Sequence, residues 1–189
     1  MAELEARAFP LLFFATGTLL LWMMATTGDQ AFMLTCLAYL AMLIFSAVSH
    51  SMFGIPEERL MEVGPESLYG CLAGLGMGLV AWASRAPYFA MRGPIQAVLL
   101  IVVIPVVEEV FFRGTLMPFV RTQSGSAAVA YVLSSVAFSA FHLLVWSVTP
   151  AWAVAYFAFG VLACWLTDRY GLGSAILMHF TANMACFLA

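Results

Sequence analysis

Two adjacent carboxylates and one arginine interrupt a strongly apolar stretch in the second half of the chain. The stretch runs from Ile101 to Gly114, and its charged residues are Glu108, Glu109 and Arg113. On insertion scales, a charge at the centre of a membrane helix costs roughly 2.5–3.5 kcal/mol. Charged side chains in such a setting are paired with one another or face a polar cavity, so these three residues are candidates for chemistry.

Helical spacing separates the two carboxylates. Glu109 and Arg113 are four residues apart, so they share a helix face and can form a salt bridge. Glu108 lies about 100° around the helix from Glu109 and needs another partner. A general base requires a carboxylate that no cation neutralises, and Glu108 fits that requirement. For these three residues alone, the alternative is a salt-bridge cluster that locks helices together.

Two of the three histidines lie in other apolar segments of the same half. His142 is near the C-terminal end of the segment 126–146, and His179 and Asn183 share a helix face in the segment 173–189. If these segments are neighbours, a carboxylate and an imidazole can deprotonate one water. A second imidazole and an amide N–H can then stabilise the oxyanion of a tetrahedral intermediate. The set predicts hydrolysis by an activated water.

Other chemistries could use the same histidines. Two histidines and a glutamate could bind zinc, although the HExxH spacing of zinc proteases is absent. A nucleophilic serine is disfavoured, because Ser139 lies about 60° from His142 around the helix. His50, beside two serines, is interpreted as interfacial and without a catalytic function. No metal ion or cofactor is expected.

The segments that must position these residues belong to a chain too apolar for a soluble domain. Of its 189 residues, 64% are hydrophobic and 9% are charged, and the mean hydropathy is +1.00. Soluble domains carry about a quarter charged residues. Length and hydropathy predict an all-α bundle of about seven transmembrane helices, forming a single domain over residues 1–189. The seven apolar segments are 9–27, 31–50, 66–84, 94–121, 126–146, 150–167 and 173–189.

Glycines and arginines indicate packing and orientation. Gly70, Gly74 and Gly78 repeat every four residues, which predicts close approach by a neighbouring helix. With seven spans, the arginine count favours a cytoplasmic N-terminus. The inner set is Arg7, Arg59, Arg121 and Arg169, and the outer set is Arg85 and Arg92. The net charge of −3 gives no indication of a nucleic-acid partner.

Three motifs in this order resemble those of the CAAX protease and bacteriocin-processing family, the Abi or glutamic-type intramembrane proteases. The motifs are Glu108-Glu109-x-x-x-Arg113, Phe138-x-x-x-His142 and His179-x-x-x-Asn183. The resemblance covers about residues 94–189, and residues 160–173 also resemble the stretch that precedes the third motif in the family.

The resemblance implies an activity and a function for each of the site residues. It implies that Glu108 and His142 activate water, and that His179 and Asn183 form the oxyanion hole. Glu109 and Arg113 would orient the site. The expected protein is a metal-independent endopeptidase in a bacterial inner membrane, acting on a membrane-associated protein or peptide such as a C-terminal sorting tail. A non-catalytic immunity or peptide-binding protein remains the alternative, and the oligomeric state is open.

Overall fold

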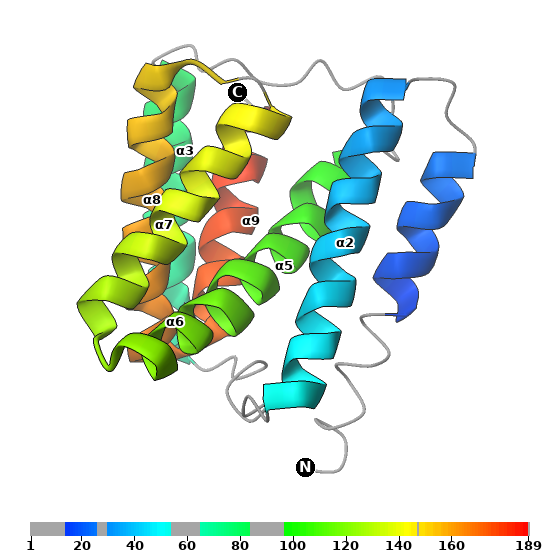
Figure 1. The fold of residues 1–189 in the computed structure, drawn as a ribbon. Helices are drawn as coiled ribbons and strands as arrows, with labels where there is room; N and C mark the ends of the chain where they lie inside the picture. Colours follow the sequence, from blue (N-terminus) through cyan, green and yellow to red (C-terminus); the bar gives the residue numbers. More distant parts are fainter. Residues whose placement is uncertain (1–13, 26–29, 54–64, 84–96, 147, 189) are drawn as a thin grey trace.

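The computed structural model describes residues 14–25, 30–53, 65–83, 97–146 and 148–188, which are almost entirely helical (Figure 1). The predicted all-α class is confirmed for these residues. The helices in chain order are Phe14–Ala25, α2 (Gln30–Phe53), η2 (Pro65–Ser67), α3 (Leu68–Ala83), η3 (Leu99–Val103), α5 (Ile104–Glu109), η4 (Val110–Leu116), α6 (Met117–Ser124), α7 (Ala127–Val145), α8 (Pro150–Tyr170) and α9 (Leu172–Leu188). Four arginines of the orientation argument lie outside the described residues, namely Arg7, Arg59, Arg85 and Arg92.

The chain is an integral membrane protein, but the predicted count of seven spans was wrong. In the part of the chain that the structure describes, three helices are long and apolar enough to cross a membrane. They are Phe32–Ser51 within α2, Ala127–Val145 and Pro150–Tyr170. Hydropathy alone counted segments whose helices are too short, because α3 has 16 residues and α9 has 17. The segment predicted at 94–121 is not one regular α-helix either.

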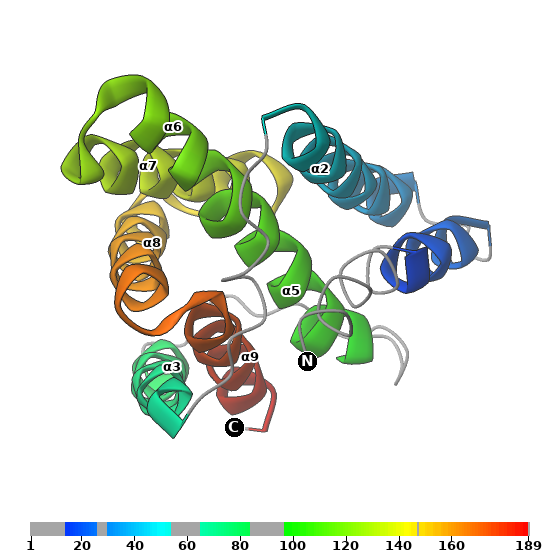
Figure 2. The ribbon, with the colours of Figure 1, turned by 90° about the horizontal axis from the view of Figure 1, so that it is seen from below.

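That fourth segment is a helical run in which π and α geometry alternate. It crosses the middle of the bundle, with α2 on one side and α7, α8, α9 and α3 on the other (Figures 1 and 2). The π segments η3 and η4 come directly before α5 and α6, whose second residues are Pro105 and Pro118. Proline lacks an N–H and clashes with the carbonyl four residues earlier. A wide π turn before each proline relieves this clash, and α-helical geometry resumes with proline in its first turn.

Side chains of neighbouring helices bind carbonyl groups of the two π segments. Ser134 of α7 donates its hydroxyl to the Phe112 carbonyl of η4 at 2.8 Å. Asn183 of α9 donates its amide to the Leu100 carbonyl of η3 at 2.9 Å. Unsatisfied carbonyls are costly in an apolar interior, so these bonds fix the position of the charged segment relative to α7 and α9.

The predicted glycine face of α3 is confirmed. Gly70, Gly74 and Gly78 are buried against α9. A Cβ added at Gly70 would overlap the Ser174 carbonyl, and one at Gly74 would overlap the Met178 carbonyl. The glycines thus let α9, which carries His179, pack closely against α3.

A polar contact joins α6, α7 and α8 near the C-terminal end of α8. Arg121 of α6 binds Asp168 of α8 at 2.5 Å, and Tyr131 of α7 donates to the same carboxylate oxygen at 2.6 Å. α6 ends at Gly125, whose φ of 65° is in the left-handed region that favours glycine. Ser126 then caps α7 through the Val129 N–H.

Candidate active site

Three parts of the chain meet at one buried polar cluster, namely the continuous run of α5 and η4, helix α7 and helix α9. The two carboxylates have 0% of their surface exposed, the guanidinium residue 1% and the two histidines 5% each. The cluster consists of Glu108 and Glu109 from α5, Arg113 from η4, His142 from α7 and His179 from α9. The structure therefore brings together five of the six residues that the sequence singled out.

Glu109 is held from two sides. Nη1 of Arg113 lies 3.1 Å from its Oε1 and 3.0 Å from its Oε2, so the predicted salt bridge is present. Nδ1 of His179 lies 2.8 Å from Oε1. The guanidinium carbon of Arg113 also lies 4.3 Å from the centroid of the Phe138 ring, which is a cation–π distance. Glu109 and Arg113 thus form a neutralised pair that also positions His179.

The carboxylate of Glu108 faces a tyrosine on one side and two histidines on the other. Tyr39 of α2 donates its hydroxyl to Oε1 at 2.5 Å. The Nε2 atoms of His142 and His179 each lie 3.8 Å from Oε2. Among the described residues, Oε2 has no hydrogen-bond partner. A distance of 3.8 Å is too long for a direct hydrogen bond but suits a bridge through one water.

His142 presents a defined nitrogen to Glu108. Its Nδ1 lies 3.0 Å from the Phe138 carbonyl, which can only accept, so Nδ1 carries the proton. In the neutral ring Nε2 is then an acceptor. The ring stacks on Tyr156 with 4.0 Å between centroids, which fixes its plane. His142 Nε2 and Glu108 Oε2 are therefore two hydrogen-bond acceptors that face each other, and each needs a hydrogen-bond donor.

Asn183 lies one helical turn beyond His179, but its amide is engaged elsewhere. The donation to the Leu100 carbonyl at 2.9 Å gives it a structural contact that the sequence did not indicate. The signal was absent because the acceptor is a backbone group 83 residues away.

Two further polar residues, Ser139 and His50, bind groups outside the cluster. Ser139 donates to the Ala153 carbonyl at 2.6 Å, which argues against the nucleophilic serine. His50 is buried rather than at a surface, and its Nε2 lies 3.3 Å from the Thr115 hydroxyl.

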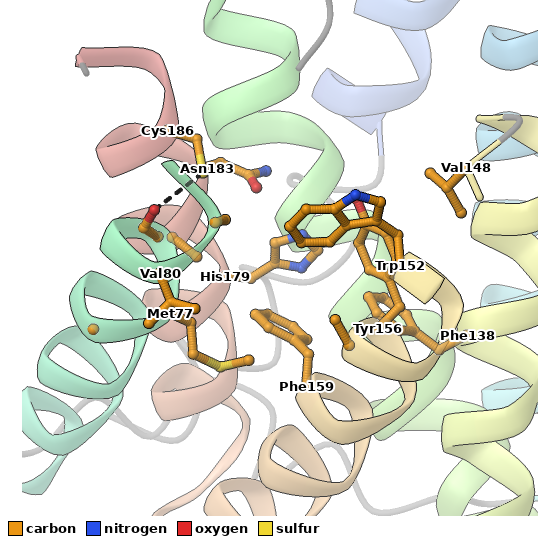
Figure 3. Close-up of a pocket in the computed structure, with 15 residues that line it drawn as sticks. Met77, Val80, Phe138, Val148, Trp152, Tyr156, Phe159, His179, Asn183 and Cys186 are labelled. Carbon is orange, nitrogen blue, oxygen red and sulfur yellow. Dashed lines mark hydrogen bonds between the residues drawn. The ribbon is translucent and has the colours of Figure 1, made fainter. Parts of the chain in front are cut away.

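A pocket of about 270 Å³ reaches the cluster between α3, α8 and α9 (Figure 3). Its lining is mostly apolar, and α8 contributes Trp152, Tyr156 and Phe159. His179 and Asn183 are the polar residues that α9 adds to the wall. Figure 3 shows the Trp152 indole extending from α8 toward these two side chains. The pocket thus places an apolar surface directly beside one histidine of the cluster.

The side chains in the described part of the chain are not arranged as the zinc alternative requires. No group of three or more His, Cys, Asp or Glu side chains there is arranged to hold a metal ion. Tetrahedral ligands about 2.0–2.2 Å from zinc would lie roughly 3.3–3.6 Å apart. The separation of 3.8 Å between Glu108 and each histidine exceeds that, so these side chains would have to move closer together.

Tyr39 and Trp146 are part of the cluster and were missed from the sequence. The indole Nε1 of Trp146 donates to the Tyr39 hydroxyl at 3.1 Å, and that hydroxyl donates to Glu108. A tyrosine in the centre of an apolar span needs a partner for its hydroxyl, which is the signal that could have identified it. Nothing in the sequence indicates which of the distant carboxylates is that partner.

Comparison with known proteins identifies the family. Residues 89–185 match the family model described as type II CAAX prenyl endopeptidase Rce1-like. No curated protein and no solved structure matches the chain. The match agrees with the resemblance drawn from the three motifs, and it spans the residues of the cluster other than Tyr39. Since it covers just over half of the 189 residues, the chain belongs to the Rce1-like family of type II CAAX prenyl endopeptidases.

Proposed function

We propose that the protein is a glutamic-type intramembrane endopeptidase that hydrolyses a peptide bond in a membrane-associated protein or peptide. The observation that carries the proposal is the buried Glu108 carboxylate, whose Oε2 faces two imidazole nitrogens at 3.8 Å each. Membership of a protease family supports a protein substrate. As part of the same proposal, the membrane is a bacterial inner membrane. The cytoplasmic N-terminus predicted from the arginines depended on seven spans, and that count was wrong.

Glu108 and His142 act together as the base. A water between them donates one hydrogen to Oε2 of the carboxylate and the other to Nε2 of the imidazole, because both atoms are acceptors. Its lone pairs are then directed at a substrate carbonyl carbon. As the water attacks, its proton passes to this pair of acceptors, which later returns it to the leaving amine.

His179 stabilises the oxyanion of the tetrahedral intermediate. Its Nδ1 is bound to Glu109, so it can donate from Nε2 only as an imidazolium. In that form the charges of Glu108, Glu109, Arg113 and His179 sum to zero, which favours burial of the cluster. Asn183 donates to Leu100 in this conformation. Its part in oxyanion binding therefore requires its amide to turn toward the substrate.

The apolar pocket holds the substrate beside the base. Its aromatic wall on α8 suits an apolar side chain or chain segment next to the scissile bond. Burial of that group excludes bulk water from the cluster and strengthens the electrostatic interactions within it.

The test is peptide cleavage by purified protein in lipid nanodiscs. Two probes are used, a farnesylated peptide with a CAAX-type C-terminus and a membrane-anchored peptide without a prenyl group. We expect Glu108→Gln and His142→Ala each to lower kcat by at least about 100-fold, since each removes half of the base. Glu66→Gln, which changes an exposed carboxylate in η2, is the matched control and should cleave normally.

Full cleavage by both active-site variants would refute the proposal. Binding of the peptides by a wild-type protein that cleaves neither would favour the non-catalytic alternative. Cleavage should persist after dialysis against a chelator, with no stoichiometric zinc in the purified protein. Loss of activity on chelation that is restored by zinc would replace the glutamic mechanism with a zinc mechanism.

A further inference from the structure

We infer that Tyr39 is a positioning residue for Glu108 and that Trp146 in turn positions Tyr39. The inference rests on the proposed function, because it assigns to these residues the orientation of the base. Tyr39 lies in α2, fifty residues before the region that matches the family model. The N-terminal half of the chain would thereby complete the active site.

The contacts form a directed chain of hydrogen bonds. Trp146 Nε1 can only donate, and it lies 3.1 Å from the Tyr39 hydroxyl oxygen. The hydroxyl hydrogen is therefore directed to Glu108, whose Oε1 accepts it at 2.5 Å. Each donor has one acceptor along this chain, so the direction of all three groups is defined.

Binding one carboxylate oxygen determines where the other one points. With Oε1 held by Tyr39, Oε2 is the oxygen that faces both Nε2 atoms at 3.8 Å. A carboxylate without this contact could rotate about its last side-chain torsion, which is broad and roughly two-fold. A misplacement of about 1 Å at a reacting group can cost about 100-fold in rate.

Tyr39 itself has little freedom to move. Its side chain is fully buried, with 0% of its surface exposed. The ring packs edge-on against Phe141, with 5.6 Å between centroids, and is tilted against Trp146 at 6.3 Å. Phe141 belongs to α7, the helix that also carries His142, and Trp146 is the C-cap residue of that helix. The end of α7 therefore positions both residues of the base, His142 directly and Glu108 through Tyr39.

The first experiment is Tyr39→Phe, which removes the hydroxyl and keeps the ring. On the farnesylated CAAX-type peptide we expect kcat to fall by about 10–100-fold with KM little changed, because the base is misaligned and the pocket is intact. The carboxylate bands of Glu108 are followed in parallel by infrared difference spectroscopy on protein with ¹³C-labelled glutamate. These bands are assigned by their loss in Glu108→Gln, and we expect Tyr39→Phe to shift them.

Two other variants complete the test. Tyr131→Phe is the matched control, since it also removes a tyrosine–carboxylate hydrogen bond, here to Asp168, and should change neither kcat nor the Glu108 bands. Trp146→Phe keeps Tyr39 and its bond to Glu108 but removes the indole donor and part of the ring that packs on Tyr39, so it should show a smaller loss and a smaller shift. It serves as the second probe if Tyr39→Phe does not fold.

The outcomes separate this inference from the proposed function. A kcat within about twofold of wild type in Tyr39→Phe would overturn the inference, whether or not the Glu108 bands shift. Unchanged Glu108 bands in Tyr39→Phe would also overturn the inference, whatever the kcat. If the wild-type protein cleaves neither probe, the proposed function fails, while the band shift still reports whether Tyr39 holds Glu108.

Discussion

The charged residues of this protein differ in how their burial is compensated. Glu109 and Arg113 are buried together, and their ion pair is supplemented by His179 and by the Phe138 ring. Glu108 is buried with a neutral donor, Tyr39, at one oxygen only. A paired charge contributes to structure, whereas a carboxylate oxygen without a partner is available for chemistry.

Removing one member of the buried Glu109–Arg113 pair should destabilise the protein more than removing both charges. We expect Arg113→Met to lower the free energy of unfolding by about 3–5 kcal/mol, because it leaves one buried negative charge of the cluster without a balancing cation. The double variant Glu109→Gln, Arg113→Met should recover part of that loss but not the activity, since His179 loses its carboxylate partner. Reversible unfolding in mixed micelles measures the effect.

The matched control for that prediction is Arg121→Met. It breaks the pair with Asp168, whose side chains are 37% and 28% exposed, and should cost no more than about 1 kcal/mol. A double variant as unstable as the sum of its two single changes would contradict the expected coupling.

At the scale of elements, the site depends on irregular and closely packed helices. The π segments on either side of α5 set the direction of the charged residues, and Ser134 and Asn183 bind the carbonyls within them. The glycine face of α3 sets the position of α9 and thus of His179. A change in either feature would move a histidine or a carboxylate without touching it.

The glycine face can be tested with two substitutions on one helix. Gly74→Ala should lower the free energy of unfolding by about 1–3 kcal/mol and reduce cleavage, because the new Cβ overlaps the α9 backbone at Met178. Gly76→Ala is the control: beyond its chain neighbours and the backbone of its own helix, no atom lies within 4 Å of its added Cβ, and it should be neutral or slightly stabilising. Equal stability of the two variants in the unfolding assay would show that the helices can separate without cost.

At the scale of the whole molecule, the outer surface is apolar enough to require lipid. Large hydrophobic side chains are exposed on helices on opposite sides of the bundle, among them Phe14, Leu144, Val154 and Leu188 at 70–81% exposure. In water, such a surface would drive aggregation. In a bilayer, the same side chains contact acyl chains at no cost.

This surface predicts how the protein behaves in membrane fractions. We expect it to remain in the pellet after alkaline carbonate extraction and to be released only by detergent. Immunoblotting of a tagged protein measures the distribution, with a peripheral membrane protein as the control. Recovery of the full-length protein in the carbonate supernatant would contradict the three candidate spans.

The sequence by itself determined the class of fold, the Glu109–Arg113 pair and the glycine face. Hydropathy indicated apolar helices, four-residue spacing paired Glu109 with Arg113, and the glycine repeat predicted the face that packs on α9. These predictions succeeded because each depends on residues within a few positions of one another along a single helix.

Only the tertiary structure decided the span count, the partners of Glu108 and the engagement of Asn183. Spans were overcounted because hydropathy does not report where a helix ends or where π geometry interrupts it. Tyr39 and Trp146 are separated by 107 residues, and Tyr39 and Glu108 by 69. No periodicity connects residues so far apart. Their contact arises from the way α2 and α7 pack around the central helical run, which is a property of the folded bundle and not of any one segment.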